Sequence, residues 1–598
     1  MKIAQGELVQ SGYEFGPFRL DVAERLLLRD GEPMLLAPKA FDTLLVLVAN
    51  CGRILRKDDL LKAVWPETIV EENNLSQYIS ALRKALGDDP NGHRYIETVP
   101  KLGYRFVARV IDAREVLAEE QTGAKESARS EGAPVRFIAV LPFKYLGGEG
   151  GDEYLGLGIA DAIITRLSNL RQIVVRPTSS VRKYASLAQN PIAAGRELRV
   201  EAVLEGNIQR AGNRIRATVQ LISVRDEAPL WAEKFDVEFG DIFTVEDTAS
   251  EYVARALIMK LTSKERELLT KRYTEDSEAY QLYLKGRYYW NKRSQGGLRA
   301  ASSYFQQAID KDPSYALAFA GLADCYNLHS YYGEFPPRES FPKAKAASTR
   351  ALEIDDGLAE AHTSLAFVRA WYDWDWLAAE SEFQRALELN PNYATAHHWY
   401  ALFLMAMERP SEALEEIKRA HEIDPLSLPI NRDVGLVYYR ARHCDRAIEQ
   451  YLKTIEMDPG FWSAHQHLGW AYEQKAMYEE AIAELNHAIA SAGDRVRILA
   501  DLGHVYAVSG RRKEAEKALA ELTGQSTQHY VSPYEIAVIY TGLEERDRAF
   551  EWLDQACLER SGWLIYLKVE PMLDSLRADP KFRDLLLRVG FEPTVVVV

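Results

Sequence analysis

Cysteine is scarce in this 598-residue chain, and no two cysteines lie at the spacing of metal ligands. Cys51, Cys325, Cys444 and Cys557 are widely scattered along the sequence. The sequence therefore excludes a disulfide framework and a cysteine-based zinc site. We expect reduced thiols, most of them buried, as in a cytoplasmic protein.

Long apolar runs are also missing. The first residues, Met1–Glu7, have no apolar signal core. No window reaches the ~20 apolar residues that a membrane helix needs. The terminal run Val595–Val598 is too short to act as an anchor. We therefore expect a cytoplasmic chain without a membrane partner.

An excess of positive charge is absent as well. The net charge is −15, with 47% hydrophobic and 27% charged residues. This balance excludes a protein that coats nucleic acid along its whole length. Residues 1–110 contain 15 Lys and Arg against 15 Asp and Glu, so the acidic excess lies downstream. A contact with DNA must be local, and a chain of this length requires several domains.

The sequence contains no complete motif for catalysis or cofactor binding. Gly156-Leu157-Gly158 lacks the third glycine of a dinucleotide loop and the Gly-Lys-Ser/Thr of a phosphate loop. His397-His398 and His465-x-His467 are not spaced i, i+4, so on a helix they point apart and disfavour a metal site. We expect no catalytic residue, no metal and no cofactor, and we interpret these histidines as packing or groove residues.

Changes in composition divide the chain. Residues 1–111 precede a linker at 112–134, which is rich in Glu, Ala, Ser, Gly and Lys. In residues 135–262, an apolar strand pattern and a helical pattern are followed by two strands around Ala211-Gly212-Asn213. This order predicts a small α/β domain.

Residues 263–570 contain an internal repeat. Small residues recur every 34 positions at Gly435, Gly469, Gly503 and Ala537, each followed by Ala twelve positions later and a bulky residue after four more. Small residues allow two antiparallel helices to cross closely, and bulky ones fill the space between helix pairs. The array resembles tetratricopeptide repeats, with about eight units and a cap and tail at 571–598. Two early steps are longer, and we assign the extra residues to loops at Ser294–Gly297 and Tyr331–Ser340.

The repeat resemblance implies a concave groove that binds a protein or peptide partner. Its groove-facing positions are His398, Arg432, Tyr439, Gln466, Trp470, Glu473, Arg497 and His504. The alternative is that these residues pack internally or are simply solvated, and the sequence favours neither. We interpret the aromatic run Trp371–Trp376 as core.

Near the N-terminus, a helical pattern leads into a hairpin pattern. The helix has one apolar face, with steps of four, three and four, at Leu75, Ile79, Leu82 and Leu86. Residues Tyr95–Phe106 alternate like a strand, turn at Pro-Lys-Leu-Gly and return as a second strand. A helix with a polar outer face followed by a hairpin is the arrangement of a winged helix.

Residues 13–110 resemble the winged-helix output domain of OmpR-type regulators, and more closely that of ToxR-type regulators. The matching motifs include Val64-Trp65, Leu82-Arg83-Lys84-Ala85-Leu86 and Gly103-Tyr104-Arg105-Phe106. ToxR-type proteins carry a membrane helix after this domain, whereas this chain has a charged linker there. Residues 135–262 resemble TolB-like amino-terminal domains, with Ile138–Phe143 among the matching segments.

The polar face of the recognition helix implies double-stranded DNA as a partner. We expect Asn73 and Gln77 to read base edges, because Asn and Gln pair bidentately with adenine. The expected phosphate contacts are Asn74, Ser76, Ser80, Arg83 and Lys84 on the helix, and Lys101 and Arg105 on the wing. We also expect a homodimer or side-by-side binding, and a contact with RNA polymerase.

The sequence thus predicts a multidomain protein with a winged helix (α+β), a small α/β domain and an all-α tetratricopeptide solenoid. We interpret it as a sequence-specific transcriptional regulator with signal or partner input through the repeats. One alternative is a non-catalytic scaffold whose winged helix contacts proteins. Another is a signalling enzyme, since similar modules accompany nucleotide cyclases, but that needs a further catalytic domain.

Overall fold

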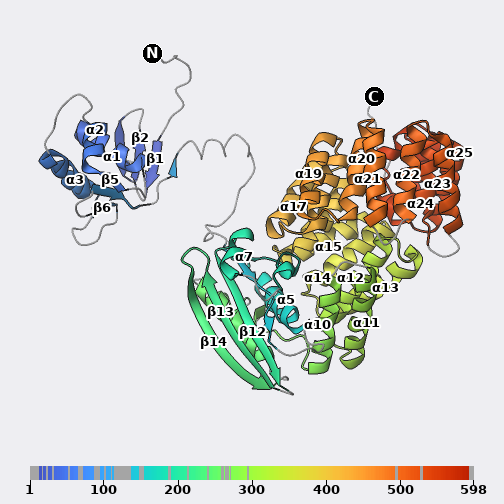
Figure 1. Cartoon of the computed structure of the whole chain (residues 1–598), viewed down its shortest axis with the longest axis horizontal. Helices are drawn as coiled ribbons and strands as arrows, with labels where there is room; N and C mark the ends of the chain where they lie inside the picture. Colours follow the sequence, from blue (N-terminus) through green and yellow to red (C-terminus); the bar gives the residue numbers. More distant parts are fainter. Residues whose placement is uncertain are drawn as a thin grey trace, which may run out of the picture. The chain divides into compact units, whose positions relative to one another are not determined.

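The computed structural model describes most of the chain as two compact units, Met1–Glu131 and Gly132–Val598 (Figure 1). The described residues are 12–591 without 16–17, 22–24, 30–31, 35, 51–53, 65–71, 87–94, 100–102, 109–110, 113–135, 147–153, 186–189, 212–213, 239–241, 258–261, 263–264, 266–267, 270, 292–294, 492–495 and 526–529.

Two small antiparallel sheets flank the helices of the first unit. The N-terminal sheet has the order β4-β3-β2-β1-β8 and the second has the order β5-β7-β6. The strands are β1 Gly12–Phe15, β2 Phe18–Asp21, β3 Leu26–Arg29, β4 Glu32–Met34, β5 Ile54–Arg56, β6 Ile96–Val99, β7 Gly103–Phe106 and β8 Ile111–Asp112. The expected hairpin at Tyr95–Phe106 is therefore present as β6 and β7.

The helices in the described part of this unit are α1 Pro38–Ala49, α2 Lys57–Val64 and α3 Glu72–Leu86. The four apolar residues of the predicted α3 face are all buried, with at most 3% exposed, which confirms that face. They pack with aromatic rings from both sheets, including Phe15 and Phe106, whose ring centroids lie 5.1 Å apart. The winged-helix fold is thus fixed by one shared core.

The second unit begins with a mixed sheet whose strand order is β11-β9-β12-β13-β14, with β10 paired to β12. Its parallel pairs are β11–β9, β9–β12 and β10–β12, and its antiparallel pairs are β12–β13 and β13–β14. The strands are β9 Arg136–Val140, β10 Lys144–Tyr145, β11 Ile173–Val175, β12 Ala202–Ala211, β13 Arg214–Ser223 and β14 Ala228–Glu238. The helices are α5 Tyr154–Ser168, α6 Thr178–Val181, η1 Arg182–Ala185, α7 Pro191–Glu197 and α8 Ile242–Leu257.

The rest of the second unit is all helical. Eight antiparallel helix pairs run from α10 to α25, and Figure 1 shows them stacked side by side along the chain. The inner helices are α10 Ser277–Asn291, α12 Ala316–Tyr331, α14 Ala359–Val368, α16 Ala394–Ala406, α18 Leu428–Arg440, α20 Trp462–Gln474, α22 Val496–Val508 and α24 Pro533–Gly542. The outer helices are α11 Gln295–Lys311, α13 Pro337–Ile354, α15 Trp376–Leu389, α17 Pro410–Ile423, α19 Cys444–Met457, α21 Tyr478–Ser491, α23 Arg512–Gln525 and α25 Arg546–Leu558.

Shorter elements follow α14 and α25. The π-helix η3 Arg369–Asp373 continues α14, and η4 Gly562–Tyr566, η5 Pro571–Leu576 and α26 Pro580–Arg588 follow α25. The fold class predicted from the sequence, a winged helix followed by an α/β domain and an all-α repeat region, is confirmed. The loop expected at Ser294–Gly297 is wrong in part, because Gln295–Gly297 form the first turn of α11.

The small residues of the repeat sit where the helices of a pair cross. A Cβ atom added to Gly435 would lie 2.4 Å from the ring of Tyr451, and one added to Gly469 would lie 2.8 Å from Leu485. Tyr451 and Leu485 are the bulky residues that the repeat predicts 16 positions later, and both are fully buried. The close crossing predicted at these small residues is therefore confirmed, whereas these bulky side chains pack within a helix pair as well.

A second 34-residue period appears in the backbone. The turn after an inner helix places one residue in the left-handed region, with φ between 57° and 79°, at Trp374, Glu408, Arg442, Ala476, Gly510 and Glu544. Only one of the six is glycine. The other five adopt a conformation that costs a side-chain-bearing residue about 1–2 kcal/mol, so helix packing overrides the local preference at each turn.

The mixed-sheet domain docks directly onto the inner side of the array. Gly158 of α5 faces Leu284 of α10, and an added Cβ would lie 3.0 Å from that side chain. Arg176, after β11, donates to the carbonyl oxygen of Ile423 at 3.1 Å, and the Asn392 amide donates to that of Ile173 at 2.9 Å. The domain and the repeats share one hydrophobic core.

The chain beyond α25 returns to the third repeat. The Trp376 indole N–H donates to the carbonyl oxygen of Gly590 at 2.9 Å, and its ring stacks on Phe591 with centroids 4.9 Å apart. Trp563 lies beside Tyr331 of α12, with ring centroids 5.6 Å apart. The C-terminal segment, residues 559–591, therefore closes the solenoid on its inner side.

Candidate nucleic-acid interface and repeat groove

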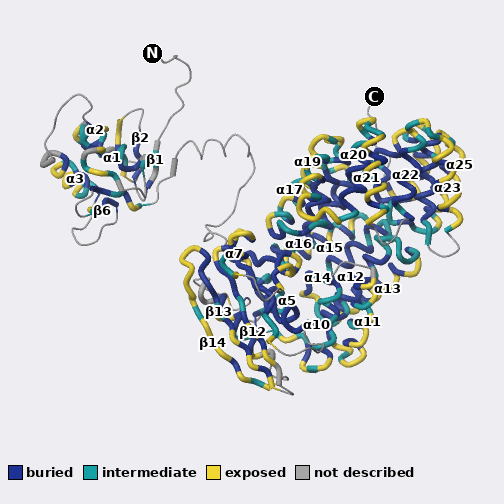
Figure 2. The backbone as a smooth tube through the Cα atoms, viewed as in Figure 1, coloured by how far each residue is buried: buried dark blue, intermediate teal, exposed yellow. Residues whose placement is uncertain are grey.

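Helix α3 presents a continuous polar face to solvent. Gln77, Ser80, Ala81 and Lys84 are all exposed, on the side opposite the buried apolar residues (Figure 2). Ser76 is also exposed, and its hydroxyl lies 3.5 Å from the Tyr104 hydroxyl. The face carries one positive charge and several groups that can both donate and accept hydrogen bonds. Such groups match the base edges and phosphates of a DNA groove.

Arg83 holds the recognition helix against the wing. Its guanidinium donates to the carbonyl oxygen of Ile96 at 2.9 Å and to the Thr98 hydroxyl at 2.7 Å, both on β6. The sequence interpretation gave this residue a phosphate contact. In the structure its Nε and Nη2 donors are directed to β6, and the phosphate contact stays a prediction.

Arg105 on β7 is likewise paired within the domain. It donates to the Glu97 carboxylate at 2.8 Å and 2.5 Å across the β6–β7 hairpin. Both residues are about one-third exposed, so the pair contributes less than about 1 kcal/mol. A phosphate contact would require Arg105 to share its donors. Lys101 lies outside the described residues, as do the side chains of Asn73 and Asn74.

Gly103 at the start of β7 allows the wing to join the rest of the sheet. A Cβ atom there would lie 1.9 Å from the carbonyl oxygen of Leu55 on β5. Only glycine lets the two strands approach this closely. The glycine of the quoted Gly-Tyr-Arg-Phe motif therefore sets the position of the wing beside α3.

Most of the residues nominated for the repeat groove are buried in the structure. Seven of the eight are at most 8% exposed, and Arg497 is intermediate. The seven buried residues are His398, Arg432, Tyr439, Gln466, Trp470, Glu473 and His504. This burial is consistent with the alternative of internal packing, and the groove assignment stays a prediction.

Their polar groups are paired with one another and with the C-terminal segment. His398 Nε2 and Arg432 Nη2 both lie 2.7 Å from Asp433 Oδ2. The Arg432 charge holds the pKa of Asp433 well below its usual range despite burial. The Tyr439 hydroxyl donates to Glu570 at 3.3 Å, and Arg497 lies 3.7 Å from the ring centroid of Trp563. The C-terminal segment thus contacts two of the nominated residues directly.

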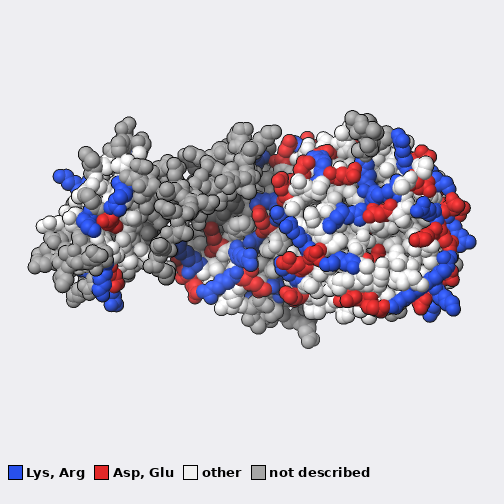
Figure 3. Space-filling model, turned by 90° about the horizontal axis from the view of Figure 1, so that it is seen from above, with Lys and Arg blue, Asp and Glu red and all other residues white. Residues whose placement is uncertain are grey.

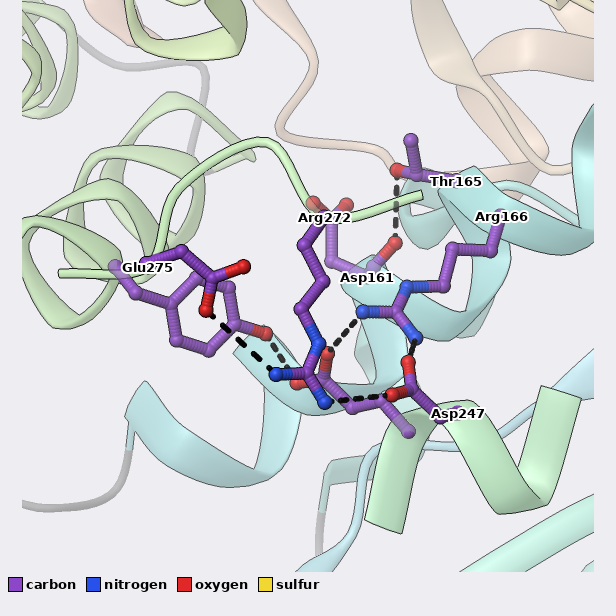
Figure 4. A network of polar contacts seen from close by, with 8 residues as sticks. Asp161, Thr165, Arg166, Asp247, Arg272 and Glu275 are labelled. Atoms are coloured by element: carbon purple, nitrogen blue, oxygen red, sulfur yellow. Dashed lines mark hydrogen bonds and ion pairs between the residues drawn. The ribbon is translucent and has the colours of Figure 1, made fainter. Parts of the chain in front are cut away.

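A second network joins the mixed-sheet domain to the first repeat (Figure 4). Arg166 of α5 pairs with Asp247 and Glu246 of α8, at 3.3 Å for Glu246. Arg272 binds Asp247 at 3.0 Å, and the Tyr280 hydroxyl of α10 donates to Glu246. Complete burial raises the pKa of Glu246 to about 7, against the opposing charge of Arg166. Sequence reasoning missed this network because its members come from three distant segments.

One histidine of each nominated pair, His397 or His465, binds the loop that precedes its helix. His397 Nδ1 lies 2.5 Å from Glu416 and its Nε2 lies 3.0 Å from the carbonyl oxygen of Pro391. His465 makes the same contacts with Glu484 at 2.6 Å and Pro459 at 3.1 Å. His362 has an equivalent arrangement, 35 positions before His397. The repeated spacing of His and Glu was the signal in the sequence that was not used.

Among the described residues, no helix combines the length and apolarity needed to cross a lipid bilayer. Figure 3 shows acidic and basic side chains interspersed over the visible face of the second unit, with no extended basic region there. This face of the second unit therefore lacks the extended basic surface that favours nucleic-acid binding.

Three family descriptions match successive parts of the chain. Residues 31–106 match "Transcriptional regulatory protein, C terminal". Residues 135–265 match "HilA/YgeH-like transcriptional regulator, second domain". Residues 366–427 and 433–495 match the tetratricopeptide repeat. The chain thus has an OmpR/PhoB-type winged helix, a HilA-like second domain and tetratricopeptide repeats.

The chain is similar to the transcriptional regulator HilA of Salmonella typhi, with 23% identity over 412 residues that cover 67% of this chain and 68% of HilA. It is also similar to the putative adenylate cyclase 3 of Rhizobium meliloti (strain 1021), with 32% identity over 237 residues. That match covers 39% of this chain and 40% of the cyclase, so the chain spans less than half of that relative.

One similar solved structure is the RstA DNA-binding domain of Klebsiella pneumoniae in complex with the RstA box. It is 31% identical, covers 16% of this chain and 96% of that one, and has a TM-score of 0.15.

Proposed function

We propose that the protein is a sequence-specific DNA-binding transcriptional regulator whose output domain is the winged helix. The observation that carries this proposal is the polar face of α3, on which Gln77, Ser80 and Lys84 are exposed. The match of residues 31–106 to a transcriptional regulatory domain and the similarity to HilA support it. Gln77 reads base edges and Lys84 contacts phosphate in this proposal.

The structure refines the proposed set of contacts. We retain Asn73, Asn74, Ser76, Ser80 and Lys101 as proposed base or phosphate contacts. We reassign Arg83 to positioning, because its donors bind Ile96 and Thr98. Arg105 contacts phosphate only by sharing its guanidinium with Glu97. Binding by a homodimer and a contact with RNA polymerase remain parts of the proposal.

The experiment compares two exposed positions of α3 in the full-length protein. DNA fragments recovered from a random-sequence selection with the wild-type protein provide the target. Gln77→Ala should relax the preference at one or two bases, since a bidentate contact contributes about 1–3 kcal/mol of discrimination. Lys84→Ala should weaken binding to all sequences alike and reduce the salt slope by about 1.

A selection that recovers no common sequence would overturn the proposal of specific binding. Unchanged preference in Gln77→Ala would refute the role given to α3. If binding to DNA were absent at low salt while partner capture persisted, the protein would be the non-catalytic scaffold that the sequence left as an alternative.

We propose that a protein partner binds the outer helices of the repeats, because the nominated groove residues are occupied internally. Exposed leucines lie on those helices, with Leu377 of α15 86% and Leu558 of α25 61% exposed. The resemblance of 135–262 to TolB-like domains and the cytoplasmic location stay predictions.

A further inference from the structure

A cavity of about 640 Å³ lies between the mixed-sheet domain and the inner helices of the array, beside the contacts that join them. Its walls come from α5, the segment after β11, and inner helices from α10 to α20. The volume lies within the range of small-molecule sites, about 300–1,000 Å³. Lys183 and Met457 line it and are exposed, so the cavity reaches solvent.

The two walls are held at a fixed separation. Arg287 of α10 binds Asp161 of α5 at 2.7 Å, and Thr178 donates to the same carboxylate. Ser179 and Ser180 donate to Asp424, at the end of α17. These contacts surround the cavity and are largely buried. The site is therefore preformed, which lowers the entropic cost of binding.

The lining combines aromatic rings with an excess of acid. Seven carboxylates and four Lys or Arg residues line the cavity. Nine aromatic side chains do so as well, among them Tyr283 and Tyr393 near the Arg287 end. Aromatic faces attract organic cations, and the attraction increases when the cation is desolvated. The composition therefore favours a positively charged ligand over an anion.

The Lys and Arg side chains that line the cavity are already paired with acceptors of the protein. Arg432 pairs with Asp433, and Lys183 with Glu197. Arg182 donates to the carbonyl oxygen of Asn291. Together with the pair between Arg287 and Asp161, this gives every cationic side chain of the lining a protein acceptor.

Glu360, on the first turn of α14, has no such counterpart. Within the described part of the chain, its carboxylate makes no ion pair and no hydrogen bond to another side chain. Burial raises its pKa, while the nearby charge of Arg287 acts in the opposite direction. A partly buried carboxylate without a cation is costly unless a ligand supplies one.

We propose that this cavity binds a small organic cation, a primary amine or a guanidine on an apolar stem, with Glu360 as its counter-ion. The stem lies against the aromatic wall and the charged group hydrogen-bonds the carboxylate. Binding then links α5, α10 and α14, which belong to two different domains. The site is separate from the DNA-binding face, so its test does not require DNA.

The experiment measures binding to the full-length protein by calorimetry and thermal denaturation. The probes are n-hexylamine, arginine amide and hexanoate, the last having the same stem as hexylamine but the opposite charge. We expect one amine or guanidine to bind with 1:1 stoichiometry and to raise the melting temperature, and hexanoate to do neither. Glu360→Gln, which keeps the side-chain shape, should weaken that binding at least tenfold.

Glu415→Gln is the matched control, because Glu415 is exposed on α17 and outside the cavity lining. It should leave binding unchanged. A melting curve of Glu360→Gln checks that the variant is folded, and Glu360→Asp, which keeps the charge, should retain part of the affinity. Equal binding of hexanoate, equal affinity in Glu360→Gln, or no saturable binding of either cation would each overturn the proposal.

Discussion

The recognition helix α3 and the inner helices of the repeat array carry similar polar side chains on one face, but different elements cover those faces. On α3, Gln77 and Lys84 are exposed to solvent. On α20, Gln466 is fully buried and donates to Asp501 at 2.5 Å. A polar helix face therefore does not identify a binding surface by itself. What matters is whether another part of the chain returns to cover it.

In the array, the C-terminal segment provides that cover. It places Glu570 against Arg440, with an N···O distance of 3.3 Å, and both side chains are at least 95% buried. Arg440 also lies 3.4 Å from the ring centroid of Tyr566. In the winged helix, Arg83 and the Ser76–Tyr104 hydroxyl contact join α3 to the wing, and Gln77 and Lys84 stay exposed.

The largest effect should follow from breaking the buried pair. Glu570→Gln leaves the Arg440 charge buried without its counter-ion, so we expect a loss of about 3–5 kcal/mol in unfolding free energy. Denaturant titration of the full-length protein measures it. The control is Asp574→Asn, which removes the partner of Arg442 from an exposed pair four residues away. It should cost less than about 1 kcal/mol. Similar losses in both variants would show that the C-terminal segment is not a structural part of the array.

The second-largest loss of stability should follow from a substitution where the two helices of a repeat cross. Gly435→Ala places a methyl group 2.4 Å from the Tyr451 ring, and we expect it to lower the unfolding free energy by about 1–3 kcal/mol. Gly524→Ala is the control, because no atom lies within 4 Å of its added Cβ. Helix propensity should make that change neutral or stabilising by up to about 1 kcal/mol. Thermal denaturation distinguishes them, and an unchanged stability in Gly435→Ala would contradict the crossing geometry.

A smaller, pH-dependent effect is expected at His465. Although burial opposes its charge, the hydrogen bonds to Glu484 and Pro459 raise the pKa of His465. A raised pKa in the folded state means that the charged ring stabilises the protein below the unfolded value of about 6.5, and that this contribution is lost as the pH rises through the folded value. His465→Gln should therefore cost about 1–2 kcal/mol at pH 6 and less at pH 9. A loss that is constant from pH 6 to pH 9 would exclude a charged ring.

The smallest effect on stability should occur on the open face. Lys84→Ala removes an exposed side chain from the end of α3, so we expect a change within about 0.5 kcal/mol. The same substitution should reduce affinity for DNA with a flatter salt dependence, as proposed above. A stability loss above 1 kcal/mol would mean that this face is covered in the protein, as the array's inner face is.

Much of the winged helix could be predicted from the sequence, because its signals are local. The steps of four, three and four in α3 fixed the buried side through Leu75, Ile79 and Leu82, and strand alternation located the hairpin. The role of Arg83 could not be predicted, since it depends on the distance between α3 and β6 in the folded domain. The position of Arg83 on the helix is equally consistent with a contact to β6 and with a contact to phosphate.

In the array, the sequence by itself determined the helix pairs. Positions such as Gly435 and Gly469 have no room for a larger side chain, so small residues recur there every 34 positions. It did not determine which inner positions remain open. That was decided by the way the helix pairs stack and by the C-terminal segment. This segment brings Trp563 against Tyr331 and Glu570 against Arg440, which both lie far earlier in the sequence. Local steric rules repeat in the sequence, whereas long-range burial depends on the summed geometry of all the repeats and leaves no fixed spacing.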